Sequence, residues 1–240
     1  MKHKLLVILV MASGIIKSQY SGYCEVETKT EGIPLFAKMG NTKVKVYSKN
    51  DKSLIEMKTI ISTVKTLYIG DDVTCTSGKD CYADKKSVIS KLQAEDLAYE
   101  DVVVKKDPET KTILNYQCKK AVITYKTKTK ELLTDQETIV WYTDKIKGFD
   151  GYNAMQGAEN DNEYTKALRS LDGCILSTEN ISKESNVKGI CTVTKLEIKD
   201  IPDDVFKLDT QKCDKIMTYK EFQTEMKRRA AMNSHRPGKY

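Results

Sequence analysis

The sequence predicts a mostly-β (α+β) protein, in which an antiparallel sheet is accompanied by a few short helices. Short segments rich in β-branched and aromatic residues recur along the 240-residue chain. Apolar and polar residues alternate within these segments, and turn residues separate them. Clear helix-boundary signals mark only two segments. The chain has no internal repeat and no Pro- or Gly-rich linker, which favours a single folded domain.

Alternation and the intervening turns identify the strands. In 43–48, Val44 and Val46 alternate with lysines, as in a half-buried strand. The polar segment 105–112 is interpreted as a solvated turn. The segment 60–69 also fits a helix, although its β-branched content and the turn after it favour a strand. Further strands are expected at 54–59, 118–127 and 137–143, with a hairpin at 174–179 and 187–198.

The first clear helix is predicted over 161–171. Asn160 or Asp161 can cap its N-terminus, and Gly173 ends it. A shorter helix is expected within 87–96. The helix over 161–171 and the second clear helix, expected over 218–229, are both short for covering the sheet that the strand segments imply.

The second clear helix lies near the C-terminus. It has a capping box, in which Thr218 is the N-cap and Glu221 follows three residues later. Met217 and Phe222 are placed to form its hydrophobic staple. We expect the basic segment 229–240 to be a disordered tail.

The N-terminal segment 1–18 is interpreted as a signal peptide. Lys2 and Lys4 supply a positive n-region, and the apolar run from Leu5 to Ile16 is shorter than the roughly 18–20 residues of a spanning helix. No later segment predicts a transmembrane helix, and the polar stretch before Cys24 argues against lipid attachment. The mature domain is expected over 19–228, in the periplasm or secreted.

Seven cysteines follow the signal segment. Export to an oxidising compartment predicts that most of them form disulfides. Cys75 and Cys81 flank a short hairpin and are predicted to pair, and Cys174 is predicted to pair with Cys191. The pairing of the other three is left open. Metal binding is the rival interpretation, but no C-x-x-C motif with nearby histidines occurs.

Histidine occurs only as His3 and His235, outside the predicted domain. A domain without histidine cannot use a Ser-His-Asp or Cys-His mechanism or a His-ligated zinc site. We therefore expect no catalytic residues, no metal and no cofactor. The acidic cluster at 159–163 lacks calcium-loop spacing and is interpreted as favourable charge near a helix N-terminus.

Two further classes of function are weighed from charge and acidic residues. A glycosidase carboxylate pair needs no histidine, so a His-free hydrolase stays a third hypothesis. Removing the three lysines of the signal segment lowers the net charge from +6 to +3. Acids and bases alternate along the chain, so nucleic acid is not predicted as a partner.

Trp141 and Tyr142 form the largest aromatic pair. Adjacent residues of a strand face opposite sides of a sheet, so one of the two belongs to the core and the other covers the sheet or lines a cavity. These two residues are the candidate ligand-binding residues.

Several segments resemble those of small exported bacterial proteins. N-Y-Q-C-K-K-A at 115–121 is similar to a G-Y-x-C-x-K-A strand opening, and T-I-V-W-Y-T at 138–143 is similar to a V-W-Y-T strand. D-G-C-I-L at 172–176 lies where one family carries its G-L-P-G motif, although the letters differ. The segments 201–206 and 217–222 resemble the closing I-P-D-S-L-F and M-T-x-E-E-F motifs.

On these segments the chain resembles the GLPGLI family and related uncharacterised exported families of Bacteroidetes-type bacteria. The resemblance implies a lipoprotein-carrier-like half-barrel, in which a strongly curved antiparallel sheet wraps over helices. It implies no catalytic residue.

Together these observations predict a non-enzymatic periplasmic or secreted binding module. Its partner would be a hydrophobic small molecule or lipid, or an envelope protein. The alternative is an envelope structural or interaction protein whose concave face is filled by its own side chains.

Overall fold

The computed structural model describes residues 21–32, 42–58, 62–96, 98–128, 133–146, 149, 162–184 and 187–234. The predicted signal segment lies outside these residues. Of 94–96, 230, 233 and 234, only the backbone is described.

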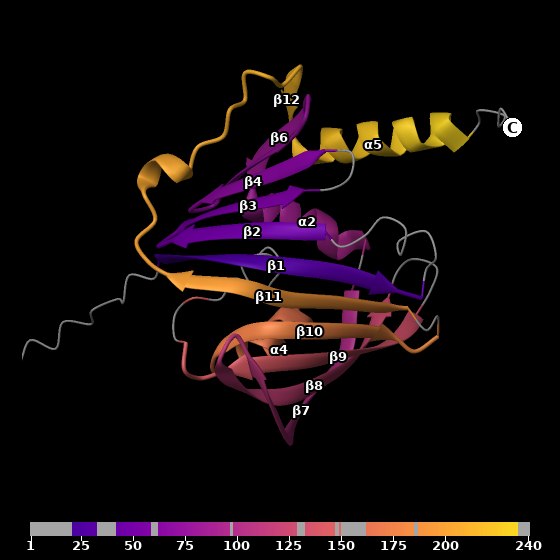
Figure 1. The fold of residues 1–240 in the computed structure, drawn as a ribbon. Helices are drawn as coiled ribbons and strands as arrows, with labels where there is room; N and C mark the ends of the chain where they lie inside the picture. The colour runs from indigo at the N-terminus through magenta and orange to yellow at the C-terminus, as the bar shows by residue number, and fades with distance from the viewer. Residues whose placement is uncertain are drawn as a thin grey trace, which may run out of the picture.

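The described strands form one sheet of twelve, in the order β12-β6-β5-β4-β3-β2-β1-β11-β10-β9-β8-β7 (Figure 1). Every pairing is antiparallel except that of β12 with β6, which is parallel. The sheet is therefore mixed but largely antiparallel. The strands are β1 (Ser21–Glu31), β2 (Thr42–Lys49), β3 (Lys52–Lys58), β4 (Thr63–Ile69), β5 (Asp72–Ser77), β6 (Asp80–Lys85), β7 (Ala98–Ile113), β8 (Tyr116–Lys128), β9 (Leu133–Thr143), β10 (Cys174–Ser182), β11 (Lys188–Ile198) and β12 (Lys215–Met217).

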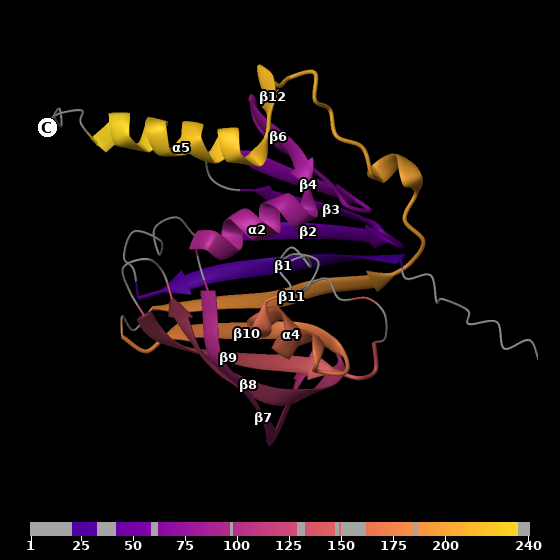
Figure 2. The ribbon, with the colours of Figure 1, turned by 180° about the vertical axis from the view of Figure 1, so that it is seen from behind.

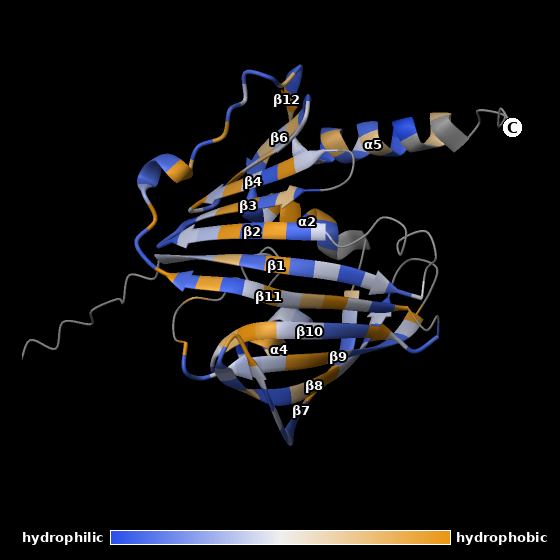
Figure 3. Ribbon diagram, in the orientation of Figure 1, coloured by the Kyte–Doolittle hydropathy of each residue, from blue (hydrophilic) through white to orange (hydrophobic). Residues whose placement is uncertain are grey.

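The alternation in the sequence matches the burial of the strands. In β2, Val44 and Val46 are buried and the lysines between them are exposed, and Figure 3 shows the same alternation of apolar and polar residues along other strands. The ambiguous segment 60–69 contains β4, as predicted. The predicted hairpin around residue 184 is also confirmed, by the pairing of β10 with β11.

Three helices accompany the sheet in the described part of the chain: α2 (Lys86–Asp96), α4 (Glu163–Arg169) and α5 (Tyr219–Ser234). In Figure 2, α2 and α4 both lie in front of the strands, so they cover the same side of the sheet. α5 crosses the β12 end, and its C-terminal part extends beyond the sheet (Figure 1). None of these helices combines the length and apolar character needed to cross a membrane.

Side chains on both faces of the sheet are buried. One core contains residues of β1, β2, β8, β9 and β10, and includes Trp141. A second lies between α4 and strands β8–β10 and includes Tyr142. In a third, Tyr23, Leu54 and Leu67 pack under Ile201 and Phe206. These two last residues belong to the segment 199–214, which connects β11 to β12 and contains a short 3-10 helix, η1 (Asp203–Val205).

The prediction of a strongly curved half-barrel is wrong. The sheet is open, with β12 and β7 as separate edges, and it is not strongly curled (Figure 1). A half-barrel would gather its apolar side chains on one concave face. Here the cores cover parts of both faces, so the sheet does not have to curve around a single core on one face.

The segment 105–112 is not a turn, because β7 continues through it. The register shifts between Asp107 and Thr110, on either side of Pro108. A proline has no N–H to donate, and β7 is an edge strand, where such a residue and a bulge are tolerated. The polar, proline-containing composition of 105–112 is typical of a turn, but an edge strand can also contain such residues.

Both clear helices have boundaries that differ from the prediction. α4 begins at Glu163 and its N-cap is Asn162, whose Oδ1 accepts a hydrogen bond from the Thr165 N–H at 2.8 Å; Asn160 and Asp161 lie outside the described residues. α5 continues to Ser234, so the expectation of a disordered tail from 229 is wrong up to that residue.

Candidate functional site

The two predicted ligand-binding residues are both core residues. Trp141 is 5% exposed and Tyr142 is 4% exposed, and as neighbours in β9 they point into different cores. The prediction that they lie on opposite faces is confirmed. Neither lines either of the two grooves described below.

The Trp141 indole has an unusual environment. Lys111 Nζ lies 4.4 Å from the centre of the ring, and Lys120 Nζ lies 5.8 Å from it. The Nε1–H is buried and has no hydrogen-bond partner among the described residues. Cation–π contacts therefore replace hydrogen bonding as the polar interactions of this ring.

The disulfide prediction is wrong at Cys75. Cys81 is bonded to Cys213, with 5.8 Å between the Cα atoms, and Cys75 keeps a buried thiol. The β5–β6 register explains this, because Cys75 lies opposite Tyr82 whereas Cys81 lies opposite Thr76. Residues directly opposite share a face and successive residues alternate, so the two cysteines point to opposite faces of the hairpin.

The predicted Cys174–Cys191 pair is also absent. Cys191 lies opposite Thr178 in the β10–β11 ladder, four residues along β10 from Cys174. At about 3.3 Å per residue, that offset exceeds the reach of a disulfide. A hairpin in the right place does not bring its cysteines together when the register is offset.

The Cys81–Cys213 bond joins two distant parts of the chain at one edge of the sheet. The segment 199–214 leaves β11, runs along the ends of the strands and reaches β6 (Figure 1). It is held by Lys49, whose Nζ donates to the Ile201 carbonyl at 3.0 Å, and by the ion pair of Lys52 with Asp203 at 2.9 Å. The chain then forms β12 against β6 and enters α5.

The start of α5 is fixed by its predicted capping box. Glu221 N–H donates to Thr218 Oγ1 at 3.3 Å, and Thr218 N–H donates to Glu221 Oε2 at 2.8 Å. The bonds that Thr218 donates to the Glu221 carboxyl, from its N–H and from its Oγ1 at 3.0 Å, lower the pKa of that carboxyl. Tyr219 N–H donates to Asp84 Oδ2 at 3.1 Å, which ties the helix to β6. The helix N-terminus therefore has its acceptors within the chain.

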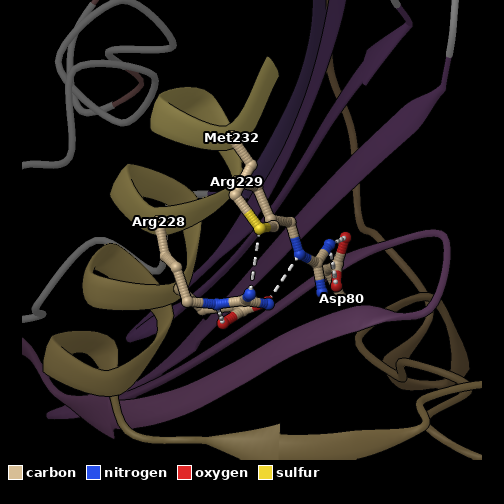
Figure 4. A network of polar contacts seen from close by, with 5 residues as sticks. Asp80, Arg228, Arg229 and Met232 are labelled. Atoms are coloured by element: carbon tan, nitrogen blue, oxygen red, sulfur yellow. Dashed lines mark hydrogen bonds and ion pairs between the residues drawn. The ribbon is translucent and has the colours of Figure 1, made fainter. Parts of the chain in front are cut away.

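Aromatic contacts and an arginine network hold the body of α5. The Tyr82 ring on β6 packs against Tyr219 at 5.1 Å and Phe222 at 5.0 Å, measured between ring centres. Further along, Arg229 Nη1 donates to both carboxylate oxygens of Asp80, at 2.9 and 3.0 Å (Figure 4).

The centre of that network is Glu225. It accepts from Arg228 Nε and Nη2 at 2.7 and 2.6 Å, and from Arg229 Nε at 2.8 Å. The hydrogen bonds from the two guanidinium groups lower the pKa of Glu225 to about 2. All of these groups are at least partly exposed to solvent, so the network orients α5 more than it stabilises the fold.

Two open grooves flank the first turns of α5. The β12–α5 groove has a volume of about 540 Å³ and is lined by Lys79, Asp80, Asp214, Lys215, Met217, Thr218, Lys220, Glu221, Thr224, Glu225 and Arg229. Its four acidic residues each have a basic partner. Charge is thus balanced within this groove.

The α2–α5 groove has a volume of about 690 Å³ and a different character. It is lined by Asp84, Ser87, Val88, Lys91, Leu92, Thr218 and Lys220. Val88 is 42% exposed, and Leu92 is half-buried. In the described part of the chain, Lys91 and Lys220 have no ion-pair partner. The groove therefore combines an apolar helix face with an excess of one positive charge, from Lys91 and Lys220 against Asp84.

Sequence reasoning missed this groove. Val88, Lys91 and Leu92 show the i, i+3, i+4 spacing of one helix face, and the sequence predicted the helix that carries them. Nothing in the sequence indicates that Thr218 and Lys220 form the opposite wall. That proximity depends on the path of 199–214 to the β6 edge.

Comparison with known proteins gives no family. No protein-family model and no curated protein matches the chain, so the likeness to the GLPGLI family stays a resemblance of short segments. Among solved structures, the chain is similar to a DUF1329 family protein from Desulfovibrio piger, with a TM-score of 0.34 and 8% identity over 80% of this chain and 91% of that one.

It is also similar to a putative outer membrane lipoprotein-sorting protein domain from Vibrio parahaemolyticus. The TM-score is 0.36, with 5% identity over 78% of this chain and 89% of that one. At these scores and identities, the likeness supports no inference about ligand or partner.

Proposed function

We propose that the protein is an exported, non-enzymatic binding module that holds an anionic amphiphile in the α2–α5 groove. The observation that carries the proposal is the combination of exposed Val88 and half-buried Leu92 with Lys91 and Lys220 in one groove. An amphiphile has an apolar chain and a charged head, and the two parts match these two kinds of lining.

The apolar part of the argument is burial. Val88 and Leu92 lie one turn apart on α2 and present a continuous apolar strip to the groove. Covering a valine side chain that is partly exposed is worth up to about 1.5 kcal/mol. The volume of about 690 Å³ is within the range of about 300–1,000 Å³ typical of small-molecule sites.

The charged part of the argument is the sign of the free groups. Asp84 is the one acidic residue lining the groove, and its two oxygens accept hydrogen bonds from the Lys85 and Tyr219 N–H groups. The Asp84 carboxylate is therefore engaged by backbone N–H groups, whereas Lys91 and Lys220 are exposed and leave the lining with an excess of one positive charge. A carboxylate or phosphate head is favoured over a cationic one.

The electrostatics of the neighbouring β12–α5 groove argue against the hydrolase hypothesis there. A carboxyl group acting as general acid needs a raised pKa. Instead, hydrogen bonds from Thr218 lower the pKa of Glu221, and hydrogen bonds from the arginines lower the pKa of Glu225. Both groups are suited to holding charge in place rather than to donating a proton.

The compartment is part of the proposal. The Cys81–Cys213 disulfide is consistent with the oxidising envelope or extracellular space that the N-terminal segment predicts. An amphiphile-binding module would meet lipids and their fragments there. Sequencing the N-terminus of the mature protein would test export directly.

Binding is tested by titrating the mature protein with dodecanoate and, separately, with dodecyltrimethylammonium. We expect saturable binding of the anion and at least about tenfold weaker binding of the cation. Lys91→Gln and Lys220→Gln should each weaken dodecanoate binding by up to about fivefold, as expected for half-exposed charge pairs.

A matched pair of variants locates the site. Val88→Asp should weaken dodecanoate binding by about tenfold or more, because it removes apolar cover and adds a negative charge. Val103→Asp is the control, since Val103 is 59% exposed on β7 at the other end of the sheet. Equal effects of the two variants would refute this location. No binding of dodecanoate would favour the interaction-protein alternative.

A further inference from the structure

We propose that the Cys81–Cys213 disulfide is a redox-controlled latch for the α2–α5 groove. In the oxidised protein it holds β12 and the start of α5 against β6. Its reduction releases that wall of the groove, and with it the bound amphiphile. This inference rests on the proposed function, because it assigns a regulation to the same site.

The position of the bond within the chain supports the latch. Thr218 and Lys220 supply one wall of the groove, and they directly follow β12. Cys213 lies two residues before β12, which begins at Lys215. The disulfide therefore attaches the chain to β6 shortly before the residues that line the groove. It fixes the position at which this segment begins.

The non-covalent attachment of this wall is small. β12 consists of three residues, and its pairing with β6 is the parallel one of the sheet. Strands this short at an edge gain little from their ladder. The preceding turn adds an Asp214 N–H to Lys79 carbonyl bond at 3.2 Å and an exposed ion pair between the same two residues at 3.5 Å.

The helix itself adds a limited set of contacts. Tyr219 and Phe222 pack on the Tyr82 ring, the Tyr219 N–H donates to Asp84, and Arg229 reaches Asp80. Gln93 Nε2 on α2 donates to the Tyr219 hydroxyl at 3.4 Å. The C-terminal part of α5 extends past the sheet (Figure 1). A helix held at the edge of the sheet by these contacts is a local unit that can open without the rest of the sheet.

The chemistry of the step follows from exposure. Cys81 is fully buried, whereas Cys213 is partly exposed, so a thiolate of a dithiol reductant attacks the Cys213 Sγ. The S–S bond breaks, and Cys81 leaves as a thiolate and takes up a proton. The second thiol of the reductant then displaces Cys213, which also leaves as a thiol. The reductant becomes a disulfide, and the protein gains two electrons and two protons.

No thiol of the same hairpin is positioned to exchange with the latch. Cys75 is the nearest in sequence to Cys81, but it faces the other side of the β5–β6 hairpin. The other thiols of the described residues lie on β1, β8, β10 and β11, which are separated from β6 by four or more strands. Control of the latch is therefore assigned to an external dithiol of the compartment. This isolation separates opening of the latch from internal reshuffling of disulfides.

The test compares oxidised protein with protein reduced by dithiothreitol, using hydrogen exchange and dodecanoate binding. We expect reduction to remove protection from 215–223 and to weaken dodecanoate binding by at least about tenfold, while β8 and β9 keep their protection. Cys81→Ser/Cys213→Ser should behave like the reduced protein, and dithiothreitol should have no further effect on it. Cys191→Ser, which removes another cysteine, should retain the response.

The outcomes separate the two proposals. If oxidised protein does not bind dodecanoate, the proposed function fails, and hydrogen exchange still reports on the latch. If the reduced protein keeps both binding and protection, the latch is refuted and the function stands. Loss of protection throughout β8 and β9 on reduction would also refute it, because the bond would then support the whole fold.

Discussion

Thr138 is the centre of a buried hydroxyl network, and replacing it with valine should destabilise the protein clearly. Its hydroxyl is fully buried on β9. It donates to Asn180 Oδ1 at 2.7 Å, and it lies 3.3 Å from the Tyr125 hydroxyl and 3.2 Å from that of Tyr164. Because its one proton goes to Asn180, the two tyrosines donate to it.

The expected loss of stability follows from the hydrogen bonds that valine cannot make. Thr138→Val keeps the shape, but it removes the donor that Asn180 Oδ1 accepts at 2.7 Å and leaves that oxygen with Tyr164 at 3.5 Å. It also removes the buried oxygen that the Tyr125 and Tyr164 hydroxyls share. Unsatisfied buried groups of this kind cost about 1–3 kcal/mol in the free energy of unfolding. For a chain of this size, that corresponds to a fall in Tm of about 2–12 °C.

The measurement is urea and thermal unfolding followed by the fluorescence of Trp141, the single tryptophan of the chain. Thr143→Val is the matched control, because Thr143 is equally buried on the same strand but accepts one bond, from the Lys145 N–H at 3.3 Å. It should cost about 0.5–1.5 kcal/mol. The network argument is refuted if Thr138→Val costs no more than Thr143→Val.

Three further outcomes are expected. Gly173→Ala should lower the free energy of unfolding by about 2–5 kcal/mol in urea, because Gly173 has φ +155° and an added Cβ would lie 2.3 Å from the Thr143 carbonyl oxygen. A change within experimental error would contradict this close approach. The pKa of Glu225 should be about 2 in a carbon-13 NMR titration. The contribution of Glu225 to stability is therefore complete above pH 4.5 and is lost as the pH falls towards 2. A pKa in the usual range of a glutamate would exclude the arginine network in solution. Burial raises the pKa of the Cys75 thiol, so alkylation of Cys75 should require unfolding. Non-reducing peptide mapping should recover Cys81 joined to Cys213, and a Cys75–Cys81 peptide would contradict the register of the β5–β6 hairpin.

The features that the sequence predicted correctly are local. Alternation located β2, and Thr218 with Glu221 located the start of α5, because a strand face and a helix cap depend on residues a few positions apart. Trp141 and Tyr142 were correctly expected on opposite faces for the same reason. The turn expected around Pro108 was wrong, because whether a strand tolerates proline depends on its place in the sheet.

The features that only the tertiary structure decided depend on register and chain path. Moving a pairing by one residue reverses the face of every side chain, and this separates Cys75 from Cys81. The bond from Cys81 to Cys213 spans 132 residues and depends on where the segment 199–214 leads after β11. The same path brings Lys220 opposite Val88 to form the candidate site, because proximity across a groove is set by the packing of distant elements rather than by any pattern within one of them.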